Sequence, residues 1–141
     1  MRTDPPLASR SPIVVNPGTL ADPTRNGYST AVVAPAGCRL AFISGQGGHD
    51  AAGRLSTDFV AQVSQAYANL ALALDALGAS PDRVVRLATF VVDHDMTKLG
   101  ILTRAVTQMF GGALPAQTLV PVARLAVDGM MFEVEATVAL E

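Results

Sequence analysis

The segment of the chain that most restricts its fold is residues 58–77, where apolar side chains recur at steps of three and four residues. They are Phe59, Val63, Ala66 or Tyr67, Leu70, and Leu74 or Leu77. This spacing puts them on one side of an α-helix, so a helix packed on a core is predicted. Ser56 or Thr57 is expected to cap its start, and Gly78 follows where a glycine commonly ends a helix. Runs rich in β-forming residues precede and follow this helix, which favours an α+β fold.

The other elements are predicted from β-propensity, helical spacing and turn residues. They are strands at 28–34, 39–45 and 83–92, a helix that opens at 93–95 and ends near 110, and strands at 117–125 and 130–140. The short link Pro35-Ala36-Gly37 predicts that the first two strands form a hairpin, and Asp128-Gly129 predicts a turn between the last two. The order ββαβαββ predicts a mixed β-sheet covered on one face by two α-helices.

Residues 1–26 hold five of the nine prolines, which block ladder hydrogen bonds. We predict an irregular N-terminal arm there, with a short extended piece at Ile13-Val14-Val15, and a disordered tail is an equally open interpretation for residues 1–12. The rest of the chain, residues 27–141, is predicted to be one domain, because 141 residues suit a single core.

The composition narrows the class of protein. The net charge is −2, which argues against a nucleic-acid partner, since phosphate binding normally needs a basic face. No apolar run reaches the length of about 20 residues that a membrane span needs, and none has the form of a signal peptide, so we expect a cytoplasmic protein without a membrane partner. Cys38 is the only cysteine, and no dinucleotide, phosphate-loop or metal signature is present, so no cofactor is expected.

Four short motifs carry a family resemblance. They are Gly27-Tyr28-Ser29, Ile43-Ser44-Gly45-Gln46, Leu114-Pro115-Ala116-Gln117-Thr118 and Phe132-Glu133-Val134-Glu135-Ala136. In this order, over roughly residues 27–140, the chain resembles the Rid family, the reactive intermediate deaminases also called YjgF-like. The resemblance implies a chorismate-mutase-like fold, a homotrimer, and clefts between subunits that bind a small-molecule metabolite.

The resemblance also implies a site. Tyr28, Ser44 and Gln117 match substrate-binding positions, and Glu133 matches a catalytic glutamate that orients the water attacking a C=N carbon. Imine-hydrolysing relatives carry arginine where this chain has Gln117. Arginine pairs both oxygens of a carboxylate, whereas glutamine brings no charge. The expected function is therefore hydrolysis of an imine, enamine or related metabolite that is not the usual carboxylate-bearing imino acid, and the alternative is a non-catalytic small-molecule-binding or regulatory trimer.

Structural roles remain open for each of these side chains. Glu133 is equally compatible with a solvated or inter-subunit ion pair, Tyr28 with an unreactive cleft wall, and Ser44 and Gln117 with polar strand positions. Arg124 is an unsuitable substitute for the family arginine, because a separation of seven residues from Gln117 puts it on the other face of a strand. The run Asp93-His94-Asp95 is more typical of a helix start than of a metal site.

Overall fold

The structure is a computed structural model that describes residues 11–141. The predictions made for residues 1–10 lie outside the described part. The short extended piece is present as β1 (Ile13–Val15), and a 3-10 turn, η2 (Pro23–Asn26), follows it. The division of the chain into an arm of residues 1–26 and a domain of residues 27–141 stays a prediction.

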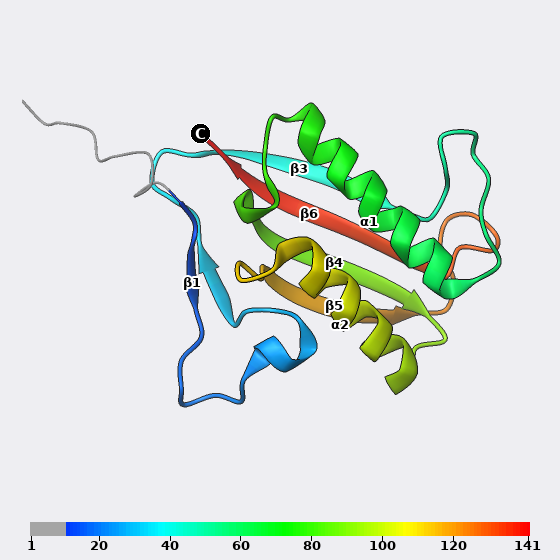
Figure 1. Cartoon of the computed structure of the whole chain (residues 1–141), viewed down its shortest axis with the longest axis horizontal. Helices are drawn as coiled ribbons and strands as arrows, with labels where there is room; N and C mark the ends of the chain where they lie inside the picture. The colour runs from blue at the N-terminus through cyan, green and yellow to red at the C-terminus, as the bar shows by residue number, and fades with distance from the viewer. Residues whose placement is uncertain (1–10) are drawn as a thin grey trace, which may run out of the picture.

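Four strands form the main sheet in the order β3-β6-β4-β5 (Figure 1). They are β3 (Arg39–Gln46), β6 (Phe132–Leu140), β4 (Val84–Val92) and β5 (Ala116–Val122). Strand β6 is antiparallel to both of its neighbours, while β4 and β5 are parallel. The sheet is therefore mixed, as predicted.

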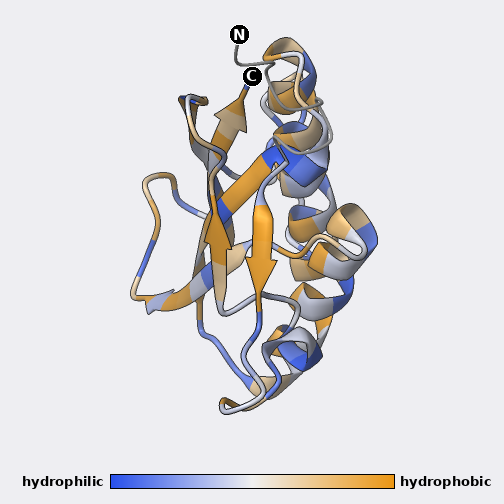
Figure 2. Cartoon of the chain, turned by 90° about the vertical axis from the view of Figure 1, so that its left-hand side faces the viewer, coloured by the Kyte–Doolittle hydropathy of each residue, from blue (hydrophilic) through white to orange (hydrophobic). Residues whose placement is uncertain are grey.

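Two helices cover one face of this sheet, α1 (Phe59–Ala76) and α2 (Met96–Phe110). Figure 2 shows both on the same side of the strands, with no helix on the other. The α1 stripe is buried as its spacing predicts, since Val63, Leu70 and Leu74 are almost fully hidden from solvent. Beneath it Phe132 stacks on Tyr67, with 5.7 Å between ring centroids. The predicted α+β fold is confirmed.

Strand β6 shows why one face is covered and the other is not. Phe132, Val134 and Val138 are fully buried under the helices, whereas the alternate residues Glu133 and Glu135 point to the opposite face. This alternation places both glutamates on the face without helices, which we call the open face.

The predicted hairpin between the first two strands is wrong. Strand β2 (Ala31–Val33) pairs with β1 in a separate two-stranded sheet, and β3 pairs with β6 instead. The Pro35-Ala36-Gly37 turn does form, with Cys38 N–H donating to the Pro35 carbonyl. A turn reverses the direction of the chain, but it does not determine which strand pairs with which. The pairing of β3 with β6 places Ile43 in the core.

Two predicted helix starts also move, and one predicted strand neighbour is absent. Asp58, rather than Ser56 or Thr57, caps α1, because its carboxylate accepts a hydrogen bond from Ala61 N–H at 3.0 Å. Asp95 caps α2 in the same way, so that helix begins at Met96 rather than at residues 93–95. The Asp128-Gly129 turn is present, with Gly129 at φ 87°, yet β4 lies between β5 and β6 and keeps them from pairing.

Candidate functional site

Tyr28 and Gln117 line one cleft at the β5 edge of the sheet. Tyr28 is brought there because Ser29 N–H donates to the Pro115 carbonyl at 3.0 Å, which attaches the start of the domain beside β5. The cleft has a volume of about 370 Å³ and is also lined by Asn26, Thr103, Thr118 and three leucines, Leu99, Leu102 and Leu119. Polar groups thus face an apolar wall supplied by α2 and β5, as in many small-molecule sites.

The side chain of Gln117 points toward the helices. Its register partner on β4 is Leu87, which is fully buried under the helix layer, and partners in a sheet share a face. The Gln117 amide oxygen is buried and accepts no hydrogen bond from the protein. A buried polar atom without a partner costs free energy, and a turn of the Gln117 amide that brings its oxygen to a hydrogen-bond donor in the cleft would remove that cost.

Ser44 and Glu133 lie away from this cleft, on the neighbouring strands β3 and β6. Glu133 lies against the backbone of Gly45, so closely that a Cβ on that glycine would stand 2.8 Å from Glu133 Cγ and nearer still to its carboxyl group. A β-bulge between Ile43 and Gln46 brings this part of β3 there. Ser44 is exposed, and the Glu133 carboxylate forms no ion pair with any side chain in residues 11–141.

The two pairs are separated within one chain. The register partner of Glu133 on β4 is Phe90, whereas the register partner of Gln117 on β4 is Leu87. Strands β6 and β5 are two strand spacings apart, at about 4.8 Å each, and Phe90 and Leu87 are three residues apart along β4, at about 3.3 Å each. The Cα atoms of Gln117 and Glu133 are therefore roughly 14 Å apart. Their side chains also leave opposite faces of the sheet. One chain therefore presents two candidate half-sites, a Tyr28–Gln117 cleft and a Ser44–Glu133 patch.

Large apolar side chains stand uncovered on the open face. Phe42 is 75% exposed, Leu40 is 52% exposed and Val120 is 37% exposed. The β4–β5 pair is parallel, and parallel strands are normally covered on both faces. Exposed apolar area of this kind is typical of a surface that binds another protein chain.

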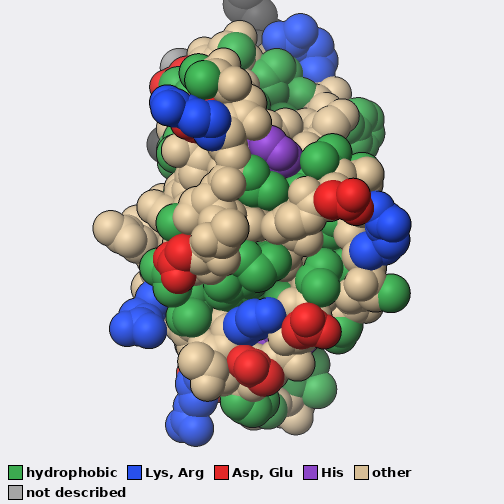
Figure 3. Space-filling view, turned by 90° about the vertical axis from the view of Figure 1, so that its right-hand side faces the viewer, with side chains coloured by type: hydrophobic (Ala, Val, Ile, Leu, Met, Phe, Trp, Pro, Cys, Tyr) green, Lys and Arg blue, Asp and Glu red, His purple; other side chains and the backbone are tan. Residues whose placement is uncertain are grey.

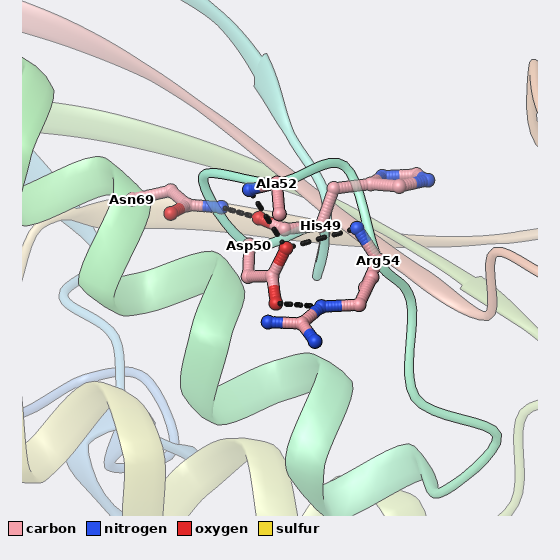
Figure 4. Close-up of polar contacts among 5 residues, drawn as sticks. All are labelled: His49, Asp50, Ala52, Arg54 and Asn69. Atoms are coloured by element: carbon pink, nitrogen blue, oxygen red, sulfur yellow. Dashed lines mark hydrogen bonds and ion pairs between the residues drawn. The ribbon is translucent and has the colours of Figure 1, made fainter.

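Side chains of α1 hold the loop that follows Ser44 and Gly45. Asn69 donates to the Gly47 carbonyl at 3.0 Å. It also donates to the His49 carbonyl at 2.8 Å, as Figure 4 shows. In the same loop the Asp50 carboxylate accepts hydrogen bonds from the backbone N–H groups of Arg54 and Ala52. These bonds hold the pKa of Asp50 below its usual value, and the bond from Arg54 has the larger effect. The His49 ring points away from this cluster (Figure 4).

The remaining candidate residues lie apart from both half-sites or have structural partners. Arg124 lies beyond the end of β5, and its guanidinium binds the Asp128 carboxylate at 2.7 Å. It is therefore a surface ion pair, and the strand-face argument does not apply to it. Asp95 is occupied as a helix cap. Within residues 11–141 no group of three or more His, Cys, Asp or Glu side chains is arranged to hold a metal ion, and no helix is long and apolar enough to cross a membrane.

Comparison with known proteins assigns the family. A family model described as Endoribonuclease L-PSP matches residues 19–140. YyfB from Yersinia pestis, of the conserved Rid protein family and of unknown function, is 35% identical; the match covers 92% of this chain and 99% of that one, with a TM-score of 0.87. The chain belongs to the Rid family. No match was found among curated proteins.

Other Rid structures are more distant. A member of the YjgF/YER057c/UK114 family from Mycobacterium tuberculosis is 27% identical over 92% of this chain and all of that chain, with a TM-score of 0.62. RidA from an Antarctic Psychrobacter is 26% identical over 94% of this chain and 95% of its own, with a TM-score of 0.66. Rid membership supports a small-molecule deaminase or an endoribonuclease-like role at the level of the family.

Charge distribution bears on the choice between these two roles. On the side of the molecule seen in Figure 3, Lys and Arg side chains alternate with Asp and Glu, and they form no continuous basic patch. An RNA-binding surface is expected to be positively charged, which neither this side nor the net charge of −2 provides.

Sequence reasoning missed much of the cleft wall. Asn26 falls in the predicted arm of residues 1–26, and Leu99 and Thr103 fall in the predicted second helix, where nothing in the sequence relates them to Gln117. The spacing of Leu99 and Thr103, four residues apart, places them on one side of α2. Only the packing of α2 beside β5 shows that this side faces Gln117.

Proposed function

We propose that this Rid protein is a homotrimeric hydrolase that converts an imine or enamine of a small metabolite into a carbonyl compound and ammonia. The observation that carries the proposal is the division of the site. Each chain has a Tyr28–Gln117 cleft and a Ser44–Glu133 patch that it cannot bring together itself. A second copy packed on the open face would supply the missing half.

The uncovered face supports this assembly. Phe42, Leu40 and Val120 are buried when sheets of neighbouring subunits meet, which removes the exposed apolar area from water. The helices lie on the other side of the sheet, and α2 reaches the contact only at the β5 edge, where it lines the Tyr28–Gln117 cleft. In such a trimer the Ser44–Glu133 patch of one subunit faces the Tyr28–Gln117 cleft of the next.

The residue types suit hydrolysis of a C=N bond. The Glu133 carboxylate accepts a proton from water, whose oxygen attacks the imine carbon. The tetrahedral adduct then gains a proton on nitrogen and expels ammonia as the carbonyl forms. Gly45 has no side chain, so the carboxylate can lie on its backbone, and Ser44 and Tyr28 offer hydroxyl groups to hold the adduct.

Gln117 limits the substrate. Replacing a charged hydrogen bond by a neutral one weakens carboxylate binding by about 1–3 kcal/mol, or roughly tenfold to a hundredfold. The absence of an arginine at this position also favours the second candidate, a trimer that binds a metabolite without turning it over. An endoribonuclease role has weaker support, because of the acidic net charge.

The test is hydrolysis of imines generated freshly in the assay by wild type, Glu133→Gln and Gln117→Arg, each first shown to be folded and of the same oligomeric state. We expect wild type to release ammonia from imines without a carboxylate, and Glu133→Gln to lose at least about a hundredfold in rate. Gln117→Arg should gain activity on amino-acid-derived imines. An unchanged rate in Glu133→Gln would refute the mechanism, and binding without turnover by wild type would favour the metabolite-binding trimer.

A further inference from the structure

The Tyr28–Gln117 cleft contains no charged side chain. Its polar lining consists of two amides, Asn26 and Gln117, and the hydroxyls of Tyr28, Thr103 and Thr118. An anion in such a cleft would lose its hydration without gaining a counter-ion, and the carboxylate that the proposed trimer brings to the cleft would repel it, which is costly. The lining therefore selects a neutral ligand group.

Gln117 also specifies the pattern of hydrogen bonds. Its amide oxygen is buried and unpartnered, and its amide nitrogen forms no hydrogen bond with any residue in 11–141. A primary amide presents donors and an acceptor side by side in one plane. It is matched by a planar group that offers an acceptor next to an N–H donor, in the way that Gln and Asn pair with the donor–acceptor edge of adenine.

A carboxylate fails to match this edge. It presents only acceptors, so one of its oxygens would face Gln117 Oε1 with no proton between them. Turning the Gln117 amide so that only its Nε2 faces the carboxylate would leave its Oε1 without a hydrogen-bond donor. A carboxamide, or the cis-amide edge of a lactam-like ring, satisfies both ends at once.

The rest of the lining sets the size and shape of the ligand. At about 370 Å³ the cleft is near the lower end of ligand pockets, which suits a small molecule. Leu99 and Leu119 form an apolar wall, and Leu119 is packed against the core beside Thr89, its register partner. Thr103 stands one helical turn from Leu99 on α2 and supplies a hydroxyl next to that wall.

We propose that the substrates of this protein are neutral compounds with a carboxamide or lactam-type edge, which Gln117 binds through both ends of its amide. The inference rests on the proposed site and names the class of substrate that it takes. Leu99 and Thr103 of α2 are the positions that choose among such compounds.

The test compares two probes that differ in this group alone, pyruvamide and pyruvate, by isothermal titration calorimetry. Wild type should bind pyruvamide at least about tenfold more tightly than pyruvate. Gln117→Leu should weaken pyruvamide binding by about tenfold or more, and Gln117→Arg should reverse the preference. Gln108→Arg is the matched control, because it adds the same charge at an exposed position of α2 outside the cleft and should leave the preference unchanged.

Equal or tighter binding of pyruvate by wild type, or no binding of pyruvamide, would overturn the inference. The outcome is separate from that of the hydrolysis assay. If pyruvamide is preferred and no imine is hydrolysed, the catalytic proposal fails and the ligand class stands. If imines are hydrolysed and the carboxylate is preferred, the ligand class fails and the catalytic proposal stands.

Discussion

Replacing Gln62 of α1, even by a residue of similar size and shape, should lower the free energy of unfolding substantially. It is fully buried, and its Nε2 donates to the carbonyls of Ser56 at 2.8 Å and Gly129 at 2.9 Å. Its Oε1 accepts from Met131 N–H at 2.8 Å. One amide therefore connects the loop before α1 to the turn before β6, two residues ahead of Glu133.

The substitution Gln62→Met isolates these hydrogen bonds. Methionine is flexible and close to glutamine in size, so the packing cost is small. Three hydrogen bonds at about 1 kcal/mol each give an expected loss of about 3 kcal/mol. The part-buried hydrogen-bonding groups of the backbone at Gly129 and Met131 would also lose a partner, which acts in the same direction.

The free energy of unfolding is measured by urea denaturation followed by far-UV circular dichroism, because the chain has no tryptophan. Protein concentration is kept constant, since assembly affects apparent stability. Gln108→Met, exposed on α2, is the control and should change stability by less than about 0.5 kcal/mol. A loss below about 1 kcal/mol in Gln62→Met would show that these hydrogen bonds do not hold the two loops together.

Three further outcomes are expected. Gly45→Ala should displace the Glu133 carboxylate and lower kcat by at least about tenfold, while the far-UV circular dichroism spectrum stays unchanged. Normal turnover in this variant would contradict the placement of Glu133. Phe42→Asp should convert the proposed trimer to folded monomers in light scattering after size exclusion, since a charge would enter an apolar interface; a stable trimer would exclude the open face as the contact. The Asp50 carboxyl resonance should titrate below about 3.9, so its stabilising contribution is present above that pH and is lost as pH falls through the lowered pKa; a midpoint at or above 3.9 would contradict the loop geometry.

Much of the fold could be predicted because its signals are local. The α1 stripe, Gly78 at its end and the alternation along β6 depend on the helical and strand periods, which are properties of neighbouring residues. The motif around Gln117 indicated the family for the same reason, since it is a run of adjacent residues. Errors arose where two local signals competed, as at Ser56 and Asp58, where several residues of capping type stand together.

Strand pairing could not be predicted in the same way. The turn at Pro35-Ala36-Gly37 pointed to a hairpin, yet β2 pairs with β1 and β3 pairs with β6, far along the chain. The burial of Ile43 against the helix layer depends on which strands occupy the sheet edges. No property of residues 28–45 alone contains that information.

The sequence by itself determined the family, the periodic elements and the identity of the polar residues, including the glutamine at position 117. Only the tertiary structure decided that Gln117 points to the helix side while Glu133 points to the open face, two strands away. The physical reason is that a side chain's direction follows from register and burial, which are set by contacts between distant segments. A candidate site divided between two faces of one sheet is therefore a property of the fold.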